Sequence, residues 1–351
     1  MDVHTIGIDL GKSVFHVVGL DSPGNVVLKR RPSRTQLLEQ LANTPACLIG
    51  MEACCGAHHL GTALAAQGHQ VRLIPAQFVR PFVKSNKNDY KDAEAIAEAV
   101  QRPTMRFVPL KTQDQLDLQA LHRVRDRLVS RRTAVINQIR AFLLERGITF
   151  RRGRKHLQQL MPSLLENAEL RVSPLLRPLL EQLWQEWKAL AEQIESTSQR
   201  IETTAQQDAA SQRLQQIPGV GPLTATAMVA AVGNGAAFVR GRDFAAWLGL
   251  VPRQHSTGGK ATLLGISKRG NPYLRRLFLH GARAVLTQAK RDQLSFRAWM
   301  DKLEDRMHRN VAVVAVANKL ARIAWAVLSK GVDYRWPSPF QAGEGGPPET
   351  A

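Results

Sequence analysis

The sequence is poor in cysteine, in long apolar runs and in acidic residues. Its three cysteines, Cys47, Cys54 and Cys55, are too few for a disulfide framework and are typical of a reducing cytoplasm. The most apolar run, residues 311–317, is far shorter than a bilayer span, so we expect no membrane partner. The first ten residues carry no basic leader and no cleavage pattern, which argues against secretion.

Acidic residues are scarce relative to basic ones. The 351 residues include 29 Asp and Glu against 48 Lys and Arg, a formal net charge of +19. Hydrophobic residues make up 44% of the chain, which is enough for real cores, and the length predicts two or three domains. A folded protein with this charge is expected to bind a polyanion, although the charge does not say what happens to that polyanion.

The positive charge is concentrated in two stretches. Residues 111–160 hold twelve Lys and Arg against four acids, a net of +8, and residues 253–291 hold nine Lys and Arg with no acid, a net of +9. A solvated helix face usually mixes charges of both signs, so the acid-free stretch favours contact with a phosphate backbone. The remaining alternative for this stretch is an anionic protein or membrane surface.

The first hundred residues alternate between strand and helix patterns. Three apolar, β-branched runs joined by short turns predict consecutive strands, and helix and strand patterns then alternate to about residue 101. The predicted strands are 3–9, 14–20, 26–29, 47–51 and 71–74, and the predicted helices are 35–42, 59–67, 77–84 and 89–101. This order is typical of a ribonuclease-H-type, RuvC-like α/β domain. It is also the order of each half of the actin-like kinases, although the second phosphate hairpin that such a fold needs is missing.

Four acids in this region are candidates for a metal site. Asp9 and Glu52 each end a predicted strand, and Asp89 and Asp92 lie three residues apart at the start of a helix, so they share a face. If the first and fourth strands are neighbours and the helix packs on them, the four carboxylates converge. Converging carboxylates need cations, and hard oxygen ligands favour Mg²⁺ or Mn²⁺. Two such ions would suit displacement at a phosphodiester.

The middle of the chain is predicted to be helical. Leu121, Val124, Leu128, Val135 and Phe142 follow a 3-4 spacing, and residues 180–201 carry about three heptads. These seams predict either an antiparallel helix pair within one chain or a coiled coil that joins protomers. The chain is thus expected to contain an α/β domain (1–105), a helical coiled-coil linker (106–211), a mostly helical domain (212–335) and a disordered tail (336–351). The Gly-rich hairpin at 217–222 could grip a phosphate or be a scaffold turn.

A second constellation surrounds a hydroxyl in a Gly-rich segment. Ser256 and Thr257 precede Gly258, and the neighbouring cations are Arg253, Lys260, Lys268, Arg269, Arg275 and Arg276. Such cations would lower the energy of an alkoxide attacking phosphate. Spacing alone favours a simple phosphate-contact loop over a nucleophile. On the helical stretch, Arg131, Arg132, Arg151 and Arg152 are further candidates for nucleic-acid contact.

Together, these residues resemble insertion-sequence transposases with a RuvC-like domain, relatives of the pilin-gene-inverting and bridge-RNA-guided recombinases. Asp9, Glu52, Asp89 and Asp92 resemble their DEDD tetrad, and the segments IPGVGP at 217–222, AAWLGLVPR at 245–253 and ISKRGNPYLR at 266–275 resemble their C-terminal transposase domain. The resemblance covers residues 3–100 and 213–333. It implies a bacterial protein of the cytoplasm, associated with the nucleoid when active.

The resemblance implies a serine nucleophile, best matched by Ser256, although a shift of one residue would select Thr257. It implies Mg²⁺ on the acids, donor and target double-stranded DNA, a guide RNA, a homodimer or homotetramer, and strand exchange without ATP. The alternative that the acids alone support is a structure-specific nuclease, similar to Holliday-junction resolvases, that uses water. An actin-like ATPase and a non-enzymatic nucleic-acid-binding module are two further hypotheses.

Overall fold

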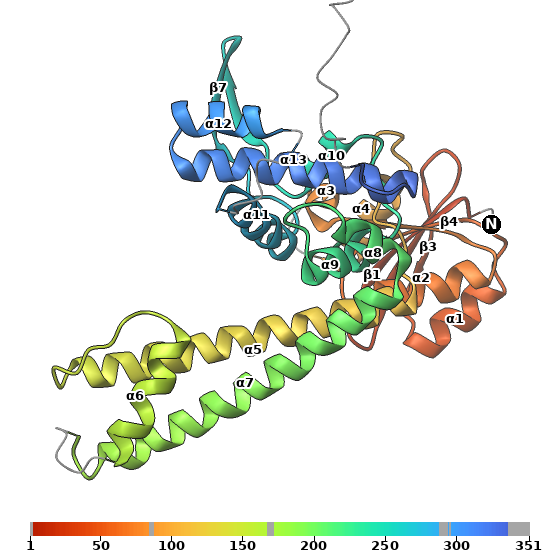
Figure 1. Ribbon diagram of the computed structural model, residues 1–351. Coiled ribbons are helices and arrows are strands. Elements are labelled where there is room, and N and C mark those ends of the chain that lie inside the picture. Colours follow the sequence, from red (N-terminus) through yellow and green to blue (C-terminus); the bar gives the residue numbers. More distant parts are fainter. Residues whose placement is uncertain (1–2, 84–87, 167–171, 288–293, 295, 336–351) are drawn as a thin grey trace, which may run out of the picture. The chain divides into compact units, whose positions relative to one another are not determined.

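A computed structural model describes residues 3–83, 88–166, 172–287, 294 and 296–335 (Figure 1). The chain divides into two compact units, residues 1–112 and 113–351. The tail at 336–351, expected to be disordered, lies outside the described residues.

The first unit is built on a five-stranded mixed sheet. Its strands are β1 (Thr5–Leu10), β2 (Phe15–Leu20), β3 (Val26–Arg30), β4 (Leu48–Glu52) and β5 (Gln70–Ile74). Their order is β3-β2-β1-β4-β5, with β1 to β3 antiparallel and β4 and β5 parallel to β1. The predicted α/β domain and the predicted adjacency of the first and fourth strands are confirmed. Its assignment to the RuvC-like class stays a prediction.

Helices cover both faces of this sheet. They are α1 (Arg34–Ala42), α2 (Ala57–Ala66), α3 (Ala76–Val79), η1 (Arg80–Phe82) and α4 (Asp89–Val100). On one face, Ile8 and Met51 pack with leucines of α1 and α2. On the other face, Val18 and Leu20 pack with alanines of α4. Alternation of side chains along β1 therefore assigns Asp9 to the face that α4 covers.

Residues 106–112 complete the first unit. Val108 forms a bridge with Leu73 at the end of the sheet, and Leu110 packs into the space above Gly61 of α2. These contacts extend the unit past residue 105, where the sequence suggested a boundary. The division of the rest into a linker (106–211) and a second domain (212–335) stays a prediction, since both lie in the second compact unit.

Two long helices begin the second unit. α5 (Gln113–Leu144) and α7 (Leu176–Gln207) each have 32 residues, about 48 Å of helix, and they lie side by side with the shorter α6 (Arg154–Glu166) (Figure 1). Apolar residues of the predicted heptads, among them Leu180 and Leu190, are buried against Val135 and Ile139 of α5. The structure thus shows the antiparallel pair within one chain.

One residue of the predicted α5 seam lies outside the core. Val124 is 53% exposed, whereas His122 is buried. Residues two apart lie about 200° apart around a helix, so a helix that buries His122 turns Val124 toward solvent.

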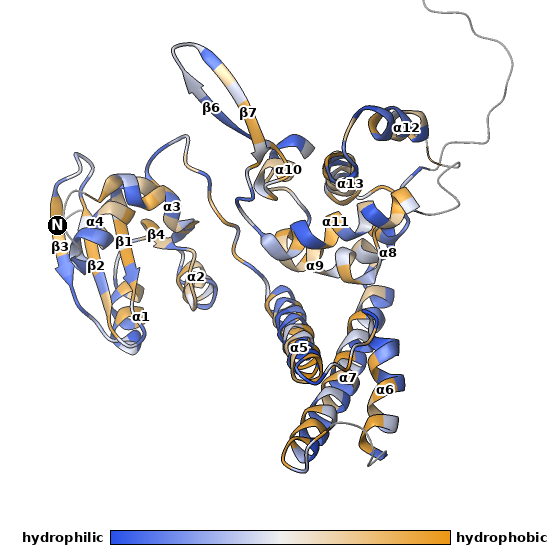
Figure 2. Cartoon of the chain, turned by 90° about the vertical axis from the view of Figure 1, so that its left-hand side faces the viewer, coloured by the Kyte–Doolittle hydropathy of each residue, from blue (hydrophilic) through white to orange (hydrophobic). Residues whose placement is uncertain are grey.

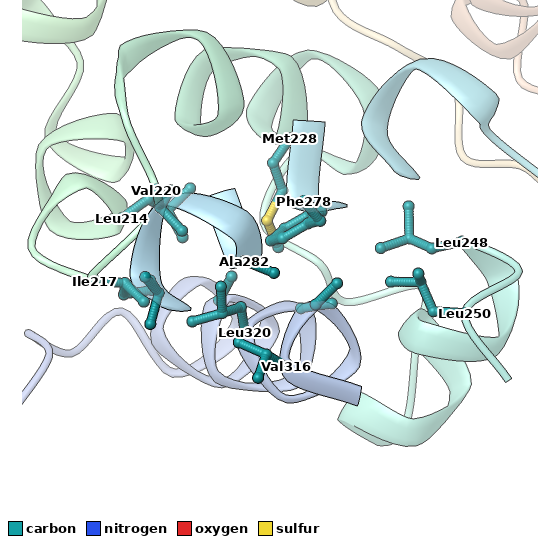
Figure 3. Close-up of a cluster of buried hydrophobic side chains, with 14 of the residues drawn as sticks. Leu214, Ile217, Val220, Met228, Leu248, Leu250, Phe278, Ala282, Val316 and Leu320 are labelled. Carbon is teal, nitrogen blue, oxygen red and sulfur yellow. The ribbon is translucent and has the colours of Figure 1, made fainter. Parts of the chain in front are cut away.

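The rest of the second unit packs around α13 (Arg309–Lys330). The other helices are α8 (Ala209–Gln215), α9 (Pro222–Val232), α10 (Gly241–Trp247), α11 (Pro272–Thr287) and α12 (Arg297–Arg306). Figure 3 shows Val316 and Leu320 of α13 beside Phe278 and Ala282 of α11. α13 is long and apolar enough to cross a membrane, but its apolar residues form this core, as in the central helix of a globular unit.

The hairpin between α8 and α9 is held by a close backbone contact. Gly219 has φ +80°, and a Cβ there would lie 2.7 Å from the carbonyl oxygen of Gly281 in α11. Its neighbours Ile217 and Val220 are buried in the core. These contacts account for the hairpin as a scaffold turn, one of the two interpretations that the sequence left open.

A buried histidine ties α5 to the helices of the core. His122 lies 2.9 Å from the Thr226 hydroxyl in α9 and 3.0 Å from the Tyr273 hydroxyl in α11. Burial, with a smaller effect from Arg125, lowers the pKa of His122 to about 4. The folded protein therefore contains His122 in its neutral form, packed between α5, α9 and α11.

This histidine should make stability depend on pH. The unfolded chain takes up the proton near pH 6.5 and the folded chain only near pH 4, so protonation favours unfolding as pH falls through this range. We expect the free energy of unfolding to fall by about 2–3 kcal/mol between pH 7 and 4.5 from this group. Urea denaturation of wild type and His122→Gln measures it. An equally steep pH dependence in both proteins would contradict the assignment.

Candidate active site

The strand-end acids lie side by side on one face of the sheet. β1 and β4 are parallel, and Gly7 pairs with Gly50 and Ile8 with Met51. Continuing this register by one residue places Asp9 beside Glu52. Because both acids come two residues after a glycine on the α4 face, both lie on that same face.

Two glycines let α4 approach the sheet closely. A Cβ on Gly7 would lie 2.0 Å from the carbonyl oxygen of Ala93 and 2.5 Å from the amide nitrogen of Ala97, both in α4. A Cβ on Gly50 would lie 2.8 Å from the side chain of Val100. The helix therefore packs directly on the strands that carry Asp9 and Glu52.

The start of α4 carries the other two acids. The side chain of Asn88 caps the helix by accepting a hydrogen bond from the amide of Tyr90 at 3.0 Å. Asp89 and Asp92 occupy the first turn, where carboxylates are stabilised by the helix dipole. Asp89 is one turn from Ala93, the residue that contacts Gly7, so the helix brings its acids toward the strand ends.

Gly7→Ala should disturb this arrangement. The new methyl would overlap backbone atoms of α4, which must move away from the sheet, and we expect a loss of about 1–3 kcal/mol in the free energy of unfolding. Urea denaturation measures the loss. Gly265→Ala is the matched control, since nothing lies within 4 Å of that position and its backbone is not left-handed. Equal stability of Gly7→Ala and the control would refute the close approach.

Electrostatic effects show that the four carboxylates act on one another. Burial raises the pKa of Asp9, and the charges of Asp89 and Asp92 raise it further. Burial likewise raises the pKa of Glu52, with contributions from Asp9 and Asp92. The acids thus form one repulsive cluster, and their role as a metal site stays a prediction.

The carboxylates of this cluster lie further apart than the ligands of a bound metal ion. Among the residues that the structure describes, no three His, Cys, Asp or Glu side chains are gathered closely enough to hold a metal ion as they stand. The donor set nevertheless fits Mg²⁺ or Mn²⁺, because it consists of hard carboxylate oxygens and because a cation would relieve the repulsion at Asp9 and Glu52.

One residue of this site was missed in the sequence. His16 of β2 pairs directly with Asp9 across the strands, its Nδ1 lies 3.6 Å from a carboxylate oxygen of Asp89, and its ring packs edge-on against Tyr90. His16 also acts to lower the pKa of Asp9. A lone histidine in an apolar run gives no signal by itself. Counting back from the turn between the first two strands would have placed it opposite Asp9.

Ser256 lies on an exposed β-hairpin in the second unit. The hairpin consists of β6 (Pro252–Thr257) and β7 (Lys260–Ile266), and it stands clear of the helices (Figure 2). Gly258 and Gly259, with φ +54° and +78°, form its turn. The hydroxyl oxygen of Ser256 accepts a hydrogen bond of 2.7 Å from the Gln254 amide. The expected Gly-rich loop is therefore only the tip of a two-stranded hairpin.

Ser256 and Thr257 face opposite sides of this hairpin. Ser256 pairs with Ala261 and Thr257 pairs with Lys260, and successive side chains of a strand alternate between its faces. Lys260 therefore lies on the face of Thr257, away from Ser256. A single bound strand on one face of the hairpin would meet only one of the two hydroxyls.

Some of the residues predicted to contact nucleic acid bond to other groups of the protein, and the others are exposed to solvent. Arg275 donates hydrogen bonds of 2.9 Å to the carbonyl oxygens of Leu248 and Arg269, so it holds the backbone of its own unit. Arg276 pairs with Asp126 and Arg131 with Glu186. The remaining exposed candidates are Arg253, Lys260, Lys268, Arg269, Arg151 and Arg152, and Arg132 is partly buried.

Comparison with known proteins covers both units. A transposase model named for the DEDD transposases of IS110 matches residues 6–147, and the model of the transposase IS116/IS110/IS902 family matches residues 211–297. The transposase for insertion sequence element IS1328 of Yersinia enterocolitica is 47% identical over 330 residues, 94% of this chain and 98% of that protein. The transposase for IS1111A of Coxiella burnetii is 44% identical over 334 residues, 95% of this chain and 92% of that protein. The predicted resemblance to insertion-sequence transposases is confirmed, and the chain belongs to the IS110/IS116 family of transposases.

Proposed function

We propose that this transposase cuts and rejoins double-stranded DNA at donor and target sites by metal-dependent transesterification. Asp9, Glu52, Asp89 and Asp92 would hold Mg²⁺ or Mn²⁺, and Ser256 would be the nucleophile. The observation that carries the proposal is the repulsive acid cluster, in which burial and then neighbouring carboxylates raise the pKa values of Asp9 and Glu52. Such a cluster costs stability unless the site binds cations.

The four acids and Ser256 would have different roles in this reaction. Mg²⁺ held by the acids would stabilise the charge that develops on the attacking and leaving oxygens. The Ser256 oxygen loses its proton and forms a bond to phosphorus while the bond to one deoxyribose oxygen breaks, leaving a phosphoserine and a free DNA hydroxyl. A hydroxyl from the exchanged strand then attacks the phosphoserine, and Ser256 regains its proton. Because bond energy is conserved in the phosphoserine, no ATP is required.

The partners follow from the exposed charge and the resemblance. Arg253, Lys260, Lys268 and Arg269 flank Ser256 in sequence and are exposed, as phosphate contacts need to be. We propose a guide RNA as a second nucleic acid and a homodimer or homotetramer as the active form, with α5 and α7 taking part in assembly.

A nuclease that uses water is the second candidate. It is favoured by one observation, that all four acids of the cluster lie within the first unit, whereas Ser256 lies in the second. The two candidates are separated by incubating the protein with Mg²⁺ and duplex DNA carrying the element ends, then denaturing it. A covalent protein–DNA product supports transesterification, and free nicked DNA alone supports hydrolysis.

A further inference from the structure

Three helices of the second unit enclose a cleft lined by arginines. The cleft has a volume of about 520 Å³ and lies among α5, α6 and α7, with Leu223 of α9 at its edge. Arg125 and Arg132 come from α5 and Arg154 begins α6. From α7, Trp187, Glu195 and Glu202 line the same cleft.

The arginines of this cleft are not neutralised by its acids. Within the described residues, none of Arg125, Arg132 and Arg154 forms an ion pair, although two carboxylates line the same space. Burial lowers the pKa of Arg132, and the charges of Arg154 and Arg125 lower it further. Like charges held together in a partly buried space are unfavourable unless an anion joins them.

One arginine of this cleft is fixed by a neutral partner. The Nε of Arg125 donates a hydrogen bond of 2.8 Å to the Ser198 hydroxyl, so the charge of Arg125 stays available to the cleft. The cleft therefore holds positive charge in a fixed position.

The spacing of the arginines suits a chain of phosphates better than a single ion. Arg125 and Arg132 are separated by two turns of α5, about 10 Å along the helix. Guanidinium groups that start from points this far apart can contact different phosphates of one strand. Guanidinium groups bind phosphate oxygens with two parallel hydrogen bonds.

We propose that the cleft among α5, α6 and α7 binds the backbone phosphates of a nucleic-acid strand through Arg125, Arg132 and Arg154. The site consists of other residues than the serine hairpin and the acid cluster. It gives the helices α5, α6 and α7 a specific binding function. The inference rests on the proposed function in one respect, that nucleic acid is the partner.

The test compares arginine variants of the full chain. Arg132→Gln and Arg154→Gln should each weaken binding about tenfold to whichever probe occupies the cleft, a 30-bp duplex DNA or a structured RNA of similar length. The slope of log affinity against log salt should become shallower by about 0.9 for duplex DNA or about 0.7 for a single strand. Arg127→Gln is the matched control, because Arg127 lies on the same helix, is exposed and does not line the cleft.

A thermal melt without nucleic acid separates binding from a structural role. Removing one of several mutually repelling arginines should leave the melting temperature of Arg132→Gln equal to or above that of wild type, and a large drop would overturn the proposal. Binding of Arg132→Gln and Arg154→Gln equal to that of Arg127→Gln, for both probes, would overturn it as well. If wild type itself binds neither probe, the proposed function fails along with the cleft.

Discussion

Asp9→Asn is expected to abolish metal-dependent DNA strand cleavage while leaving the fold intact. Asp9 is the last residue but one of β1 and lies beside Glu52, and the charges of both acids at the start of α4 act on its carboxylate. Loss of one ligand from a divalent-cation site removes several kcal/mol of transition-state stabilisation, which corresponds to a reduction on the order of a thousandfold. Cleavage of duplex DNA carrying the element ends, with Mg²⁺, measures the effect.

The same variant should not lose stability in the absence of metal. The folded state holds the Asp9 proton to a higher pH than the unfolded chain does, because burial and neighbouring carboxylates raise its pKa. The group therefore favours folding at low pH, and that contribution is lost as pH rises through the folded-state pKa. Asparagine cannot ionise, so Asp9→Asn should melt at the same temperature as wild type or higher at neutral pH.

Glu39→Gln provides the matched control for this experiment. Glu39 is exposed on α1 of the same unit and is not coupled to the cluster. It removes one negative charge without touching the candidate site, so both cleavage and melting should be those of wild type. Cleavage by Asp9→Asn at the rate of Glu39→Gln would refute the metal-site assignment.

The architecture of the first unit was predictable because local signals and global packing agree there. The first three strands are β-branched apolar runs joined by short turns, and the observed bounds of all five strands lie within two residues of those expected. The position of the acids followed from the same pattern, since Asp9 and Glu52 each come at the end of such a run. Gly7 and Gly50 allow α4 to approach the sheet closely. Their role could not be predicted before the pairing of β1 with β4 was known.

The second unit was less predictable because its key contacts join distant segments. The hairpin strand β6 reads Pro-Arg-Gln-His-Ser-Thr, and since it is exposed on both faces it carries no alternating apolar signal. Arg275 and Arg276 are adjacent and equivalent in sequence, yet one holds backbone carbonyls and the other pairs with Asp126. Nor does sequence spacing reveal that Arg154 joins Arg125 and Arg132, because α6 must first fold back on α5.

Ser256→Ala is expected to eliminate the covalent protein–DNA intermediate, whereas Thr257→Ala should retain it. The two hydroxyls lie on opposite faces of the β6–β7 hairpin, so one bound phosphate meets only one of them. Ser256 is the residue that the family resemblance selects, and the hydrogen bond that its oxygen accepts from the Gln254 side chain would stabilise the alkoxide.

The measurement is denaturing electrophoresis of the protein with element-end DNA and Mg²⁺, followed by mass spectrometry of the modified peptide. We expect loss of the adduct and of recombination by at least about a thousandfold for Ser256→Ala, and a change within a few-fold for Thr257→Ala. Unchanged DNA affinity in both variants shows that the hairpin still binds. An adduct on Thr257, or one that survives Ser256→Ala, would move the nucleophile to the other face. Cleavage by Ser256→Ala at the wild-type rate without any adduct would instead make water the nucleophile and the acid cluster a self-sufficient nuclease site.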